Sequence, residues 1–507
     1  MKRTWVLGLA ALCFSACGGT LGPSTAKVAE PAVAVAAAAP AVAAPDRTKP
    51  PAPGTARPFA LPAEQRLTLP NGLEVVLIPR AGVPSLAMRL SIRAGRDASS
   101  DNVALPELTA RLLRDGTKTQ DATELAEFAD RNGLAVDAGA EANRVLLSAA
   151  GLTQNAEAML SVLRVMAQEA AFPQDRVAAR QKEYAGELEL EASEPDFHLQ
   201  RLTYKVLFGS HPYAAVLPTA ADIAKVDRRA IERFYKQNYG PKRARLVVVG
   251  QIPEGFEAQL RAALATWRSS ASTWKPAEAP RIEVCNEAFV VLRPDSVQTN
   301  INWVGPGVRQ ADPDYFNTLL ANQVLGGNAG ARLFMNLRES KSYTYGAYSR
   351  LSQIYGGAWF TAFSNVRGPV TEGALTEFRN EFARMAEGTI EEKELAGAVD
   401  YLAGIFPIQI EENGPLADVV LRTLDQGLEV DYLKSYRDRV RGVTRAQAEQ
   451  AARRNMSGTA LSLIMVGTEE QTVANAKAQS SKVNIYDLDG KKVREEAGNL
   501  ARLCTGR

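Results

Sequence analysis

The 507-residue sequence has very little histidine, little cysteine and almost no net charge. Its two histidines, His198 and His211, are 13 residues apart, which matches no ligand spacing typical of zinc sites. We therefore expect both to be structural, and no Ser-His-Asp or Cys-His catalytic motif can be assembled from the sequence. Because 59 lysines and arginines balance 57 acidic residues, no net field attracts nucleic acid or a strongly charged substrate.

The hydrophobic run at the N-terminus is short. Trp5–Phe14 falls below the roughly 20 apolar residues that a membrane span requires. Two basic residues precede it, and Ser-Ala-Cys ending at Cys17 follows it, with two glycines behind. This pattern is typical of a lipoprotein signal peptide, so we expect residues 1–17 to be a signal segment with Cys17 lipidated. The alternative is a cleaved, soluble secreted form.

Lipidation would anchor the protein to a membrane of the cell envelope, facing the periplasm. Gly18 stands where an aspartate often retains lipoproteins at the inner membrane, so we expect the outer membrane. Of the four cysteines, Cys13 would be removed and Cys17 acylated, which leaves Cys285 and Cys504. In an oxidising compartment these two can form a disulfide. Two unpaired thiols are the alternative, because the sequence gives no Cα separation.

Two stretches of the chain repeat the same order of elements about 215 residues apart. Each has a strand-like run, a second strand, a helical segment and a closing apolar strand that ends in glycine. This order predicts an α+β fold of two homologous halves, each a mostly antiparallel sheet with helices packed on one face. The matching segments are residues 73–78 and 289–292, 85–92 and 298–304, 104–114 and 315–325, and 245–250 and 461–467.

The same pattern sets the domain boundaries. Residues 18–60 are rich in alanine, proline and valine without periodicity, which predicts a linker. The two halves span residues 67–270 and 281–470, with a stretch of linker composition between them. Residues 471–507 are expected to form a polar C-terminal tail with one strand-like piece, Lys482–Tyr486.

A helical segment of the first half runs into a Gly-Thr turn at Gly116. Segment and turn resemble the pitrilysin/insulinase-type zinc peptidase family, in which this helix carries an inverted zinc motif, His-x-x-Glu-His, about five residues before the turn. In this sequence Glu107 and Arg111 fall on the two histidine positions, and Ala110 falls on the glutamate position. The motif is therefore degenerate.

These substitutions remove the chemistry of the motif. Zinc needs three protein ligands and an open water site, and the family glutamate is the base that activates this water. Arginine cannot bind zinc and alanine cannot accept a proton, so we expect no intact catalytic residue and no metal or other cofactor in this chain. Glu107 and Arg111 instead have i, i+4 spacing, which predicts a helix ion pair worth about 0.3–0.5 kcal/mol if exposed. The resemblance puts the third ligand at Glu187, which we interpret as a leftover acid on a solvated helix face.

The second half keeps more of the family pattern. A glycine loop, residues 326–330, leads into Leu337-Arg338-Glu339 and then into a tyrosine-containing segment. In active members of the family an arginine and a tyrosine here contact the bound peptide, so the resemblance implies that Arg338 and Tyr345 bind substrate. The alternative is that Arg338 caps a helix C-terminus and Tyr345 fills a sheet core.

Together these features predict a non-catalytic, substrate-binding subunit of a zinc-dependent peptidase pair that acts on peptides in the cell envelope. The resemblance implies zinc in a homologous partner subunit, because some family members divide the zinc motif and the arginine-tyrosine pair between two chains. An extended peptide would add to an exposed sheet edge as an extra strand. The alternatives are a peptide-binding or scaffold lipoprotein with no hydrolytic role, and a self-sufficient metallopeptidase with an unrecognised site.

Overall fold

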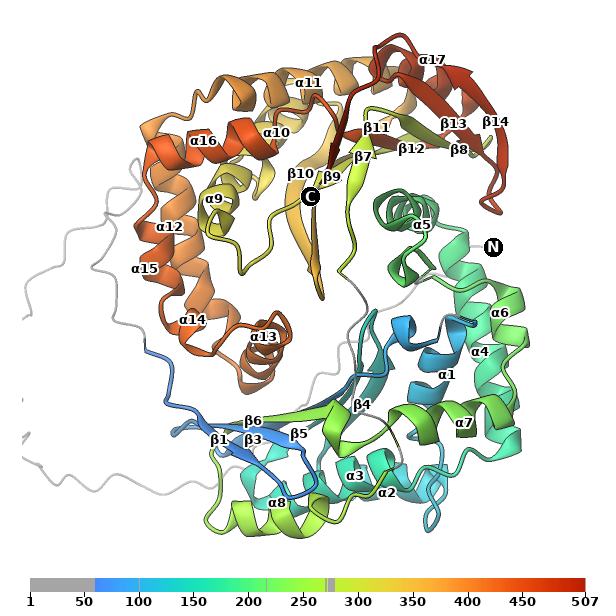
Figure 1. Cartoon of the computed structure of the whole chain (residues 1–507), viewed down its shortest axis with the longest axis vertical. Helices are drawn as coiled ribbons and strands as arrows, with labels where there is room; N and C mark the ends of the chain where they lie inside the picture. The colour runs from blue at the N-terminus through green and yellow to red at the C-terminus, as the bar shows by residue number, and fades with distance from the viewer. Residues whose placement is uncertain (1–59, 100, 216, 270, 272–278, 507) are drawn as a thin grey trace, which may run out of the picture. The chain divides into compact units, whose positions relative to one another are not determined.

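Two β-sheets, one in each half of the chain, organise the fold (Figure 1). The structure is a computed structural model that describes residues 60–99, 101–215, 217–269, 271 and 279–506. The predicted signal segment, Cys17 and nearly all of the predicted linker lie outside these residues. Residues 59–507 form one compact unit. None of the helices in the described ranges is both long and apolar enough to cross a bilayer.

The first half contains a six-stranded sheet with the strand order β1-β2-β6-β3-β5-β4. β2 and β6 pair in parallel, and the other neighbouring strands are antiparallel. Three of these strands confirm the predictions made for residues 73–78, 85–92 and 245–250. The strands are β1 (Gln65–Thr68), β2 (Glu74–Pro79), β3 (Ser85–Ile92), β4 (Ala135–Ala140), β5 (Val145–Leu152) and β6 (Ala244–Gly250).

The second half contains a seven-stranded sheet with the strand order β10-β11-β9-β12-β8-β13-β14. Its β13 confirms the strand predicted at Lys482–Tyr486, and β14 follows it, so residues of the expected tail complete this sheet. The strands are β8 (Ala288–Leu292), β9 (Gln298–Pro306), β10 (Thr344–Ile354), β11 (Gly357–Arg367), β12 (Ser462–Gly467), β13 (Lys482–Tyr486) and β14 (Lys492–Ala497).

The end of the chain is held to the second half by a small two-stranded sheet. β7 (Glu283–Cys285) pairs with β15 (Cys504–Gly506), and a disulfide joins Cys285 to Cys504. Of the two states that the sequence left open for these cysteines, the structure contains the bridged one.

Apart from α5, the helices of the first half cover the outer face of its sheet and pack through a shared apolar core, for example Leu108, Leu160 and Val248. Local signals set several starts: Asp121 and Glu124 form a reciprocal capping box, as do Thr219 and Asp222. The helices are α1 (Ala104–Leu112), α2 (Ala122–Arg131), α3 (Ala156–Gln168), α4 (Gln174–Ala192), α5 (Pro195–Phe208), α6 (Ala220–Ala224), α7 (Arg228–Asn238) and α8 (Phe256–Leu264).

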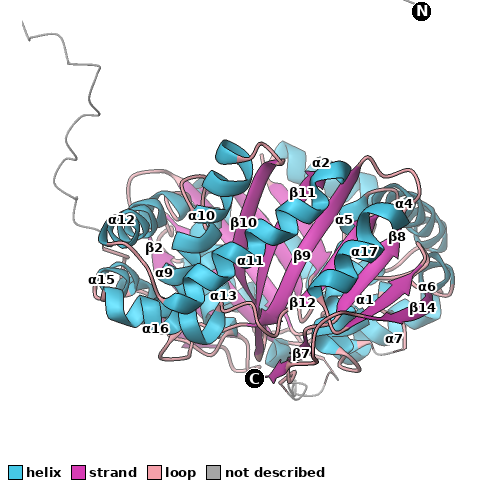
Figure 2. Ribbon diagram, turned by 90° about the horizontal axis from the view of Figure 1, so that it is seen from above, coloured by secondary structure: helices cyan, strands magenta, loops and turns pink. Residues whose placement is uncertain are grey.

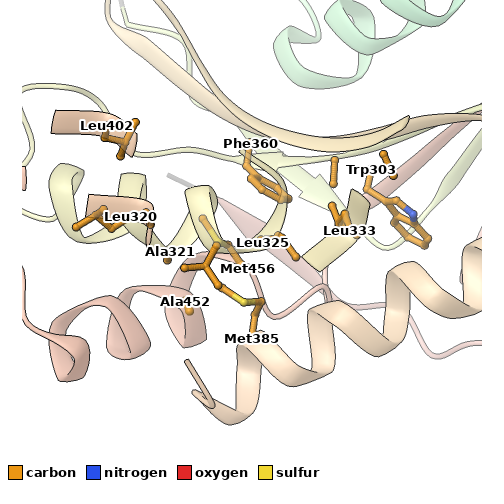
Figure 3. Packing of buried hydrophobic residues seen from close by; sticks show 14 of the residues in the cluster. Trp303, Leu320, Ala321, Leu325, Leu333, Phe360, Met385, Leu402, Ala452 and Met456 are labelled. Carbon is orange, nitrogen blue, oxygen red and sulfur yellow. The ribbon is translucent and has the colours of Figure 1, made fainter. Parts of the chain in front are cut away.

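The second half repeats this arrangement, with α9, α11 and α17 in front of the outer sheet face (Figure 2). Trp303 and Phe360 of the sheet pack with Leu320 and Leu325 of α9 and with Met385 of α11 in one buried cluster (Figure 3). The helices are α9 (Tyr315–Gly326), α10 (Arg332–Phe334), α11 (Thr371–Glu387), α12 (Glu392–Gln409), α13 (Asn413–Asp425), α14 (Asp431–Lys434), α15 (Tyr436–Arg441), α16 (Arg445–Asn455) and α17 (Glu469–Gln479).

The opposite face of each sheet is covered by one helix from the other half. α13 packs on β3 and β6 of the first sheet, and α5 packs on β9 and β12 of the second. Strand alternation explains how one strand serves both faces: Val248 joins the outer core of the first half, whereas Val247 and Val249 join the cluster that contains α13. The predicted α+β halves are confirmed, and this exchange of helices adds an inner layer that the sequence did not predict.

Ion pairs fasten α13 to the first sheet. Asp418 accepts from Arg89 Nε at 2.8 Å. Asp425, only 6 % exposed, forms ion pairs with Arg93 at 2.5 Å and Arg144 at 2.8 Å, and its Oδ1 lies 3.5 Å from a third arginine, at position 245. These buried ion pairs hold α13, a helix of the second half, against the first half, and we call this contact the clamp.

Candidate functional site

The degenerate motif on α1 forms a compact ionic cluster. Arg111 Nε donates to Glu107 Oε1 at 2.8 Å, which confirms the predicted i, i+4 pair. Arg111 Nη1 also donates to Glu187 Oε2 on α4 at 2.7 Å, and the guanidinium lies 4.4 Å from the ring centroid of Tyr184. An arginine cation therefore lies between two carboxylates at the positions where the resemblance puts zinc ligands.

Glu187 has a specific partner. The sequence-based interpretation of Glu187 as one of several acids on a solvated helix face is corrected by its ion pair with Arg111. The side chain of Glu187 is still 43 % exposed, and that of Glu107 only 10 %. The contact arises because α4 packs beside α1, a tertiary arrangement that local sequence does not reveal.

The cluster keeps its arginine charged. Burial lowers the pKa of Arg111, but hydrogen bonds to Glu107 and Glu187 outweigh burial, and the net shift of this pKa is upward. Glu107 is also held by the backbone N–H of Ala140, at 2.9 Å, and lies 3.6 Å from Arg96 Nη2. Each oxygen of this buried carboxylate thus has a cationic or N–H partner.

The residues at the motif do not fit a zinc ion. A guanidinium has no lone pair to give to a metal, and its positive charge already lies between the two carboxylates that could have served. Ala110, at the position of the catalytic base, is fully buried and apolar. Across the described ranges, no group of three or more His, Cys, Asp or Glu side chains is placed to hold a metal ion.

The predicted addition of a peptide to a sheet edge meets obstacles at two edge strands. At β4, Glu107 accepts from the N–H of Ala140, and Arg114 Nη1 donates to the carbonyl of Val136 at 3.3 Å. At β10, Asn322 of α9 donates to the carbonyl of Ser349 at 3.3 Å. Some of the backbone groups that an added strand would use are therefore engaged at these two edges, and the addition of a peptide to a sheet edge stays a prediction.

Arg338 and Tyr345, the two residues that the resemblance implies as substrate-binding, lie side by side in the second half. Arg338 Nη1 donates to the backbone carbonyl of Tyr345 at 2.8 Å, and its guanidinium lies 4.9 Å from the ring centroid of Phe334. The side chain of Tyr345 is highly exposed, at 85 %, which contradicts the alternative in which it fills the sheet core. Its hydroxyl is therefore available to a ligand.

Tyr345 lies on the rim of a cavity of about 950 Å³ between α5 and strands β9, β10 and β11. We call this cavity the α5 groove. Its walls combine aromatic rings, side-chain amides and carboxylates, the mixture that binding sites for peptides and small polar ligands use. Its lining includes Glu191, Glu194, Asp196, Thr203, Tyr204, Asn302, Tyr345, Arg350, Trp359, Phe363 and Asn365.

The α5 groove borders the ionic cluster on α1. Burial raises the pKa of Tyr204 in the groove wall, and the positive charge of Arg96 partly offsets this rise. Burial likewise raises the pKa of Tyr184 to about 12, with Arg96 and Arg111 opposing and Glu191 of the groove assisting. The sequence does not predict the groove, because its α5 wall belongs to the first half and packs on the sheet of the second half.

The two histidines have structural contacts. His198 Nε2 lies 2.8 Å from the carbonyl oxygen of Ala192, and burial lowers the pKa of this imidazole. His211 Nδ1 accepts from the backbone N–H of Tyr213 at 3.2 Å, and the two rings lie 4.5 Å apart.

Known proteins resemble both the sequence and the fold. Residues 225–402 match the family described as "Peptidase M16 inactive domain". The uncharacterized zinc protease YmxG of Bacillus subtilis is 22 % identical over 351 residues, covering 69 % of this chain and 85 % of the relative. The uncharacterized zinc protease SCO5738 of Streptomyces coelicolor is 22 % identical over 362 residues, covering 69 % and 78 %.

Two solved structures share the fold. A peptidase M16 inactive domain from Pseudomonas fluorescens has a TM-score of 0.72 and 24 % identity, and the match covers 80 % of this chain and 98 % of that one. The periplasmic protease PqqL from Escherichia coli has a TM-score of 0.65 and 17 % identity, with 82 % of this chain and 48 % of that one covered. The two solved structures confirm the predicted fold, and the match of residues 225–402 together with the zinc-protease relatives agrees with the family resemblance drawn from the sequence.

Proposed function

We propose that this chain, a homologue of the M16 zinc proteases whose residues 225–402 match the inactive domain of that family, is the non-catalytic, substrate-binding subunit of a zinc-dependent peptidase pair. The zinc would belong to a homologous partner subunit, and the substrates would be peptides in the cell envelope. One observation carries the proposal: Arg111 lies between Glu107 and Glu187 at the degenerate motif, while Arg338 and Tyr345 remain together beside an open groove.

The second half supports the substrate-binding role through the chemistry of its exposed groups. A tyrosine hydroxyl can donate to a peptide carbonyl or to the oxyanion that develops there during cleavage. Arg338 is positioned for this task indirectly, because its hydrogen bond to the carbonyl of Tyr345 orients the segment that presents the ring. The α5 groove supplies room and polar partners for the peptide on the same side.

Reconstitution with a zinc-bearing homologue tests the proposal. Cleavage of an unstructured peptide library is measured for this chain, for the partner and for the two together. We expect cleavage by the pair to exceed that by either chain alone. The Tyr345→Phe substitution should lower kcat/KM of the pair by about 100-fold, because one hydrogen-bond donor at a developing oxyanion is lost.

Tyr401→Phe on α12 is the matched control, since Tyr401 is also exposed, at 44 %, and lies outside the α5 groove. A pair no more active than the partner alone would refute the peptidase role. If this chain binds the peptides but leaves cleavage unchanged, the alternative of a peptide-binding or scaffold lipoprotein replaces it.

The location in the envelope is part of the same proposal. The signal pattern supports a lipid anchor at Cys17 and an outer-membrane protein that faces the periplasm. Membrane fractionation of the natural chain beside its Cys17→Ala variant tests it: the natural chain should enter the outer-membrane fraction, and the variant should not.

A further inference from the structure

Strand β10 contains a β-bulge at the rim of the α5 groove. Thr344 of β10 pairs with Val366 of β11. The next paired residue of β10, Ala347, lies opposite Ser364. The two residues of β10 at positions 345 and 346 therefore occupy the space of a single residue of β11. Bulges of this kind occur often beside active sites, where they redirect a side chain.

The bulge decides which face of the sheet Tyr345 meets. Ala347 is buried in the core on the outer face. Side chains two positions apart on a regular strand share a face, so position 345 would belong to that core as well. Tyr345 is instead highly exposed and lines the α5 groove on the opposite face, as Tyr348 and Arg350 do. The extra residue thus places the tyrosine on the groove face.

Neighbouring hydroxyl groups hold the backbone of the bulge. The hydroxyl of Thr344 accepts from the N–H of Gly346 at 3.1 Å and donates to the carbonyl of Asn365 on β11 at 2.7 Å. The carbonyl of Gly346 accepts from the hydroxyl of the buried Ser364 at 2.9 Å and lies 3.0 Å from that of Thr344. Both backbone groups of Gly346 therefore have side-chain partners.

The chain enters the bulge through a left-handed residue. Ser342 has a φ of 55°, which is uncommon for a residue other than glycine. It follows a π-helical turn, Met335–Ser340, that contains Arg338. The N–H of Ser342 donates to the carbonyl of Arg338 at 3.0 Å, and its carbonyl accepts from Arg367 at 3.1 Å. Such backbone features cluster where a function needs a fixed geometry.

The absence of a side chain at Gly346 leaves room for an aromatic ring. A Cβ at this position would lie 2.7 Å from Cε2 of Tyr348, so the ring would have to move. The ring of Tyr348 lies 5.6 Å from that of Phe334, against which the guanidinium of Arg338 is placed. The bulge and the arginine that donates to the carbonyl of Tyr345 are thus parts of one packed arrangement.

We propose that Thr344 and Ser364 are positioning residues, which hold the bulge so that the hydroxyl of Tyr345 meets a peptide bound in the α5 groove. This inference rests on the proposed function and adds two residues that act through Tyr345. A donor stabilises a developing oxyanion best when its geometry is fixed before the reaction. Misplacement by about 1 Å can lower the rate of an enzyme about 100-fold.

Hydrogen exchange of the full chain, followed by mass spectrometry, tests the bulge without a substrate. The amide of Gly346 should exchange slowly, because it donates to Thr344. Thr344→Val removes the hydroxyl but keeps the branched shape, and should speed this exchange about tenfold. Thr344→Ser should keep the protection. Thr68→Val, at an exposed threonine of β1 outside the groove, is the matched control and should leave the exchange of Gly346 unchanged.

Peptide cleavage by the pair with a zinc-bearing homologue tests the positioning role. Thr344→Val should lower kcat about tenfold and keep KM within about twofold, because the oxyanion exists only in the transition state. Thr344→Ser should keep the natural kcat. Ser364→Ala is an independent variant of the same bulge and should lower kcat with KM kept. Thr344→Val combined with Tyr345→Phe should be no slower than Tyr345→Phe alone, because Thr344 acts through the tyrosine hydroxyl.

The results separate the inference from the proposed function. Unchanged exchange of Gly346 in Thr344→Val would overturn the role of Thr344 in the bulge. If Tyr345→Phe lowers kcat but Thr344→Val and Ser364→Ala do not, the positioning role is wrong and the proposed function stands. A double variant about tenfold slower than Tyr345→Phe would also overturn the inference, because Thr344 would act independently of Tyr345. If Tyr345→Phe leaves kcat unchanged, the proposed role of the tyrosine fails, and the inference fails with it.

Discussion

Helices α5 and α13 occupy equivalent places in the two halves, but their acidic side chains are neutralised differently. Asp418 and Asp425 of α13 are paired with arginines of the first sheet. Asp196 of α5 accepts from an asparagine amide, and no ion pair reaches it among the described residues. One helix is clamped to the neighbouring sheet, whereas the other forms the wall of a cavity. Charge pairing thus distinguishes the helix that is tied to the neighbouring sheet from the helix that lines a cavity in the same topology.

The largest effect is expected from breaking the clamp at Asp425. Asp425→Asn would remove the buried carboxylate at which the guanidiniums of Arg93 and Arg144 meet, and Arg144 would keep the half-exposed Glu141 as a counter-charge. Loss of one partner from a buried ionic group costs about 3–5 kcal/mol. We expect the free energy of unfolding, measured by urea denaturation followed by circular dichroism, to fall by this amount.

The matched change on the other helix is Asp196→Asn. Asp196 has only an amide partner, so we expect a loss below about 1 kcal/mol. Equal losses of unfolding free energy for Asp425→Asn and Asp196→Asn would mean that ion pairs hold α5 and α13 equally. The contrast drawn between the two helices would then be wrong.

A loss smaller than that at Asp425 is expected at the degenerate motif, where an arginine also pairs with acids of the first half. Arg111→Met keeps the length of the side chain but leaves the buried Glu107 with the N–H of Ala140 and with Arg96 at 3.6 Å. We expect the free energy of unfolding to fall by about 2 kcal/mol, the cost of leaving a buried charged acceptor underpaired. Differential scanning calorimetry measures the change.

Arg131→Met is the control for this substitution. Arg131 forms the same i, i+4 pair with Glu127 on α2, but both side chains are mostly exposed. Its loss should be about 0.3–0.5 kcal/mol. If the two substitutions gave similar losses, the Arg111 cluster would be an ordinary surface pair.

The sequence predicted the parts of this architecture that depend on local spacing. The apolar runs at residues 85–92 and 461–467 predicted the strands found there. A buried strand needs little more than a short β-branched or apolar stretch between turns. The pair of Glu107 and Arg111 followed from i, i+4 spacing on one helix. These contacts join residues that are near each other along the chain.

Contacts between distant elements could not be predicted in the same way. Glu187 reaches Arg111 from 76 positions away, and nothing in its own segment distinguishes it from the neighbouring acids. The α5 groove requires the wall of one half to lie on the sheet of the other, as with Thr203 and Asn302. The resemblance supplied Arg338 and Tyr345, but the exposure of the tyrosine ring came only from the folded chain.

Asp97 gives a small expected effect, and this effect depends on pH. It is a half-buried acid in the turn Arg96–Ala98, and burial raises its pKa to about 6 although Arg93 and Arg243 oppose the rise. Because the folded pKa lies above the ordinary value of 3.8, ionisation opposes folding. Stability contributed by the protonated form is present below about pH 4 and is lost as the pH rises through about 6.

Asp97→Asn cannot ionise, so this variant should match the natural chain near pH 4 and exceed its free energy of unfolding at neutral pH. We expect a difference on the order of 1 kcal/mol, since solvent screening reduces the effect for a half-buried group. Urea denaturation at several pH values gives the curve, with the exposed Asp130→Asn on α2 as control. Parallel curves for Asp97→Asn and the natural chain would show that the charge of Asp97 is compensated by its neighbouring arginines, as Asp425 is. A difference in free energy of unfolding that grows with pH would show that ion pairs do not neutralise the charge of Asp97.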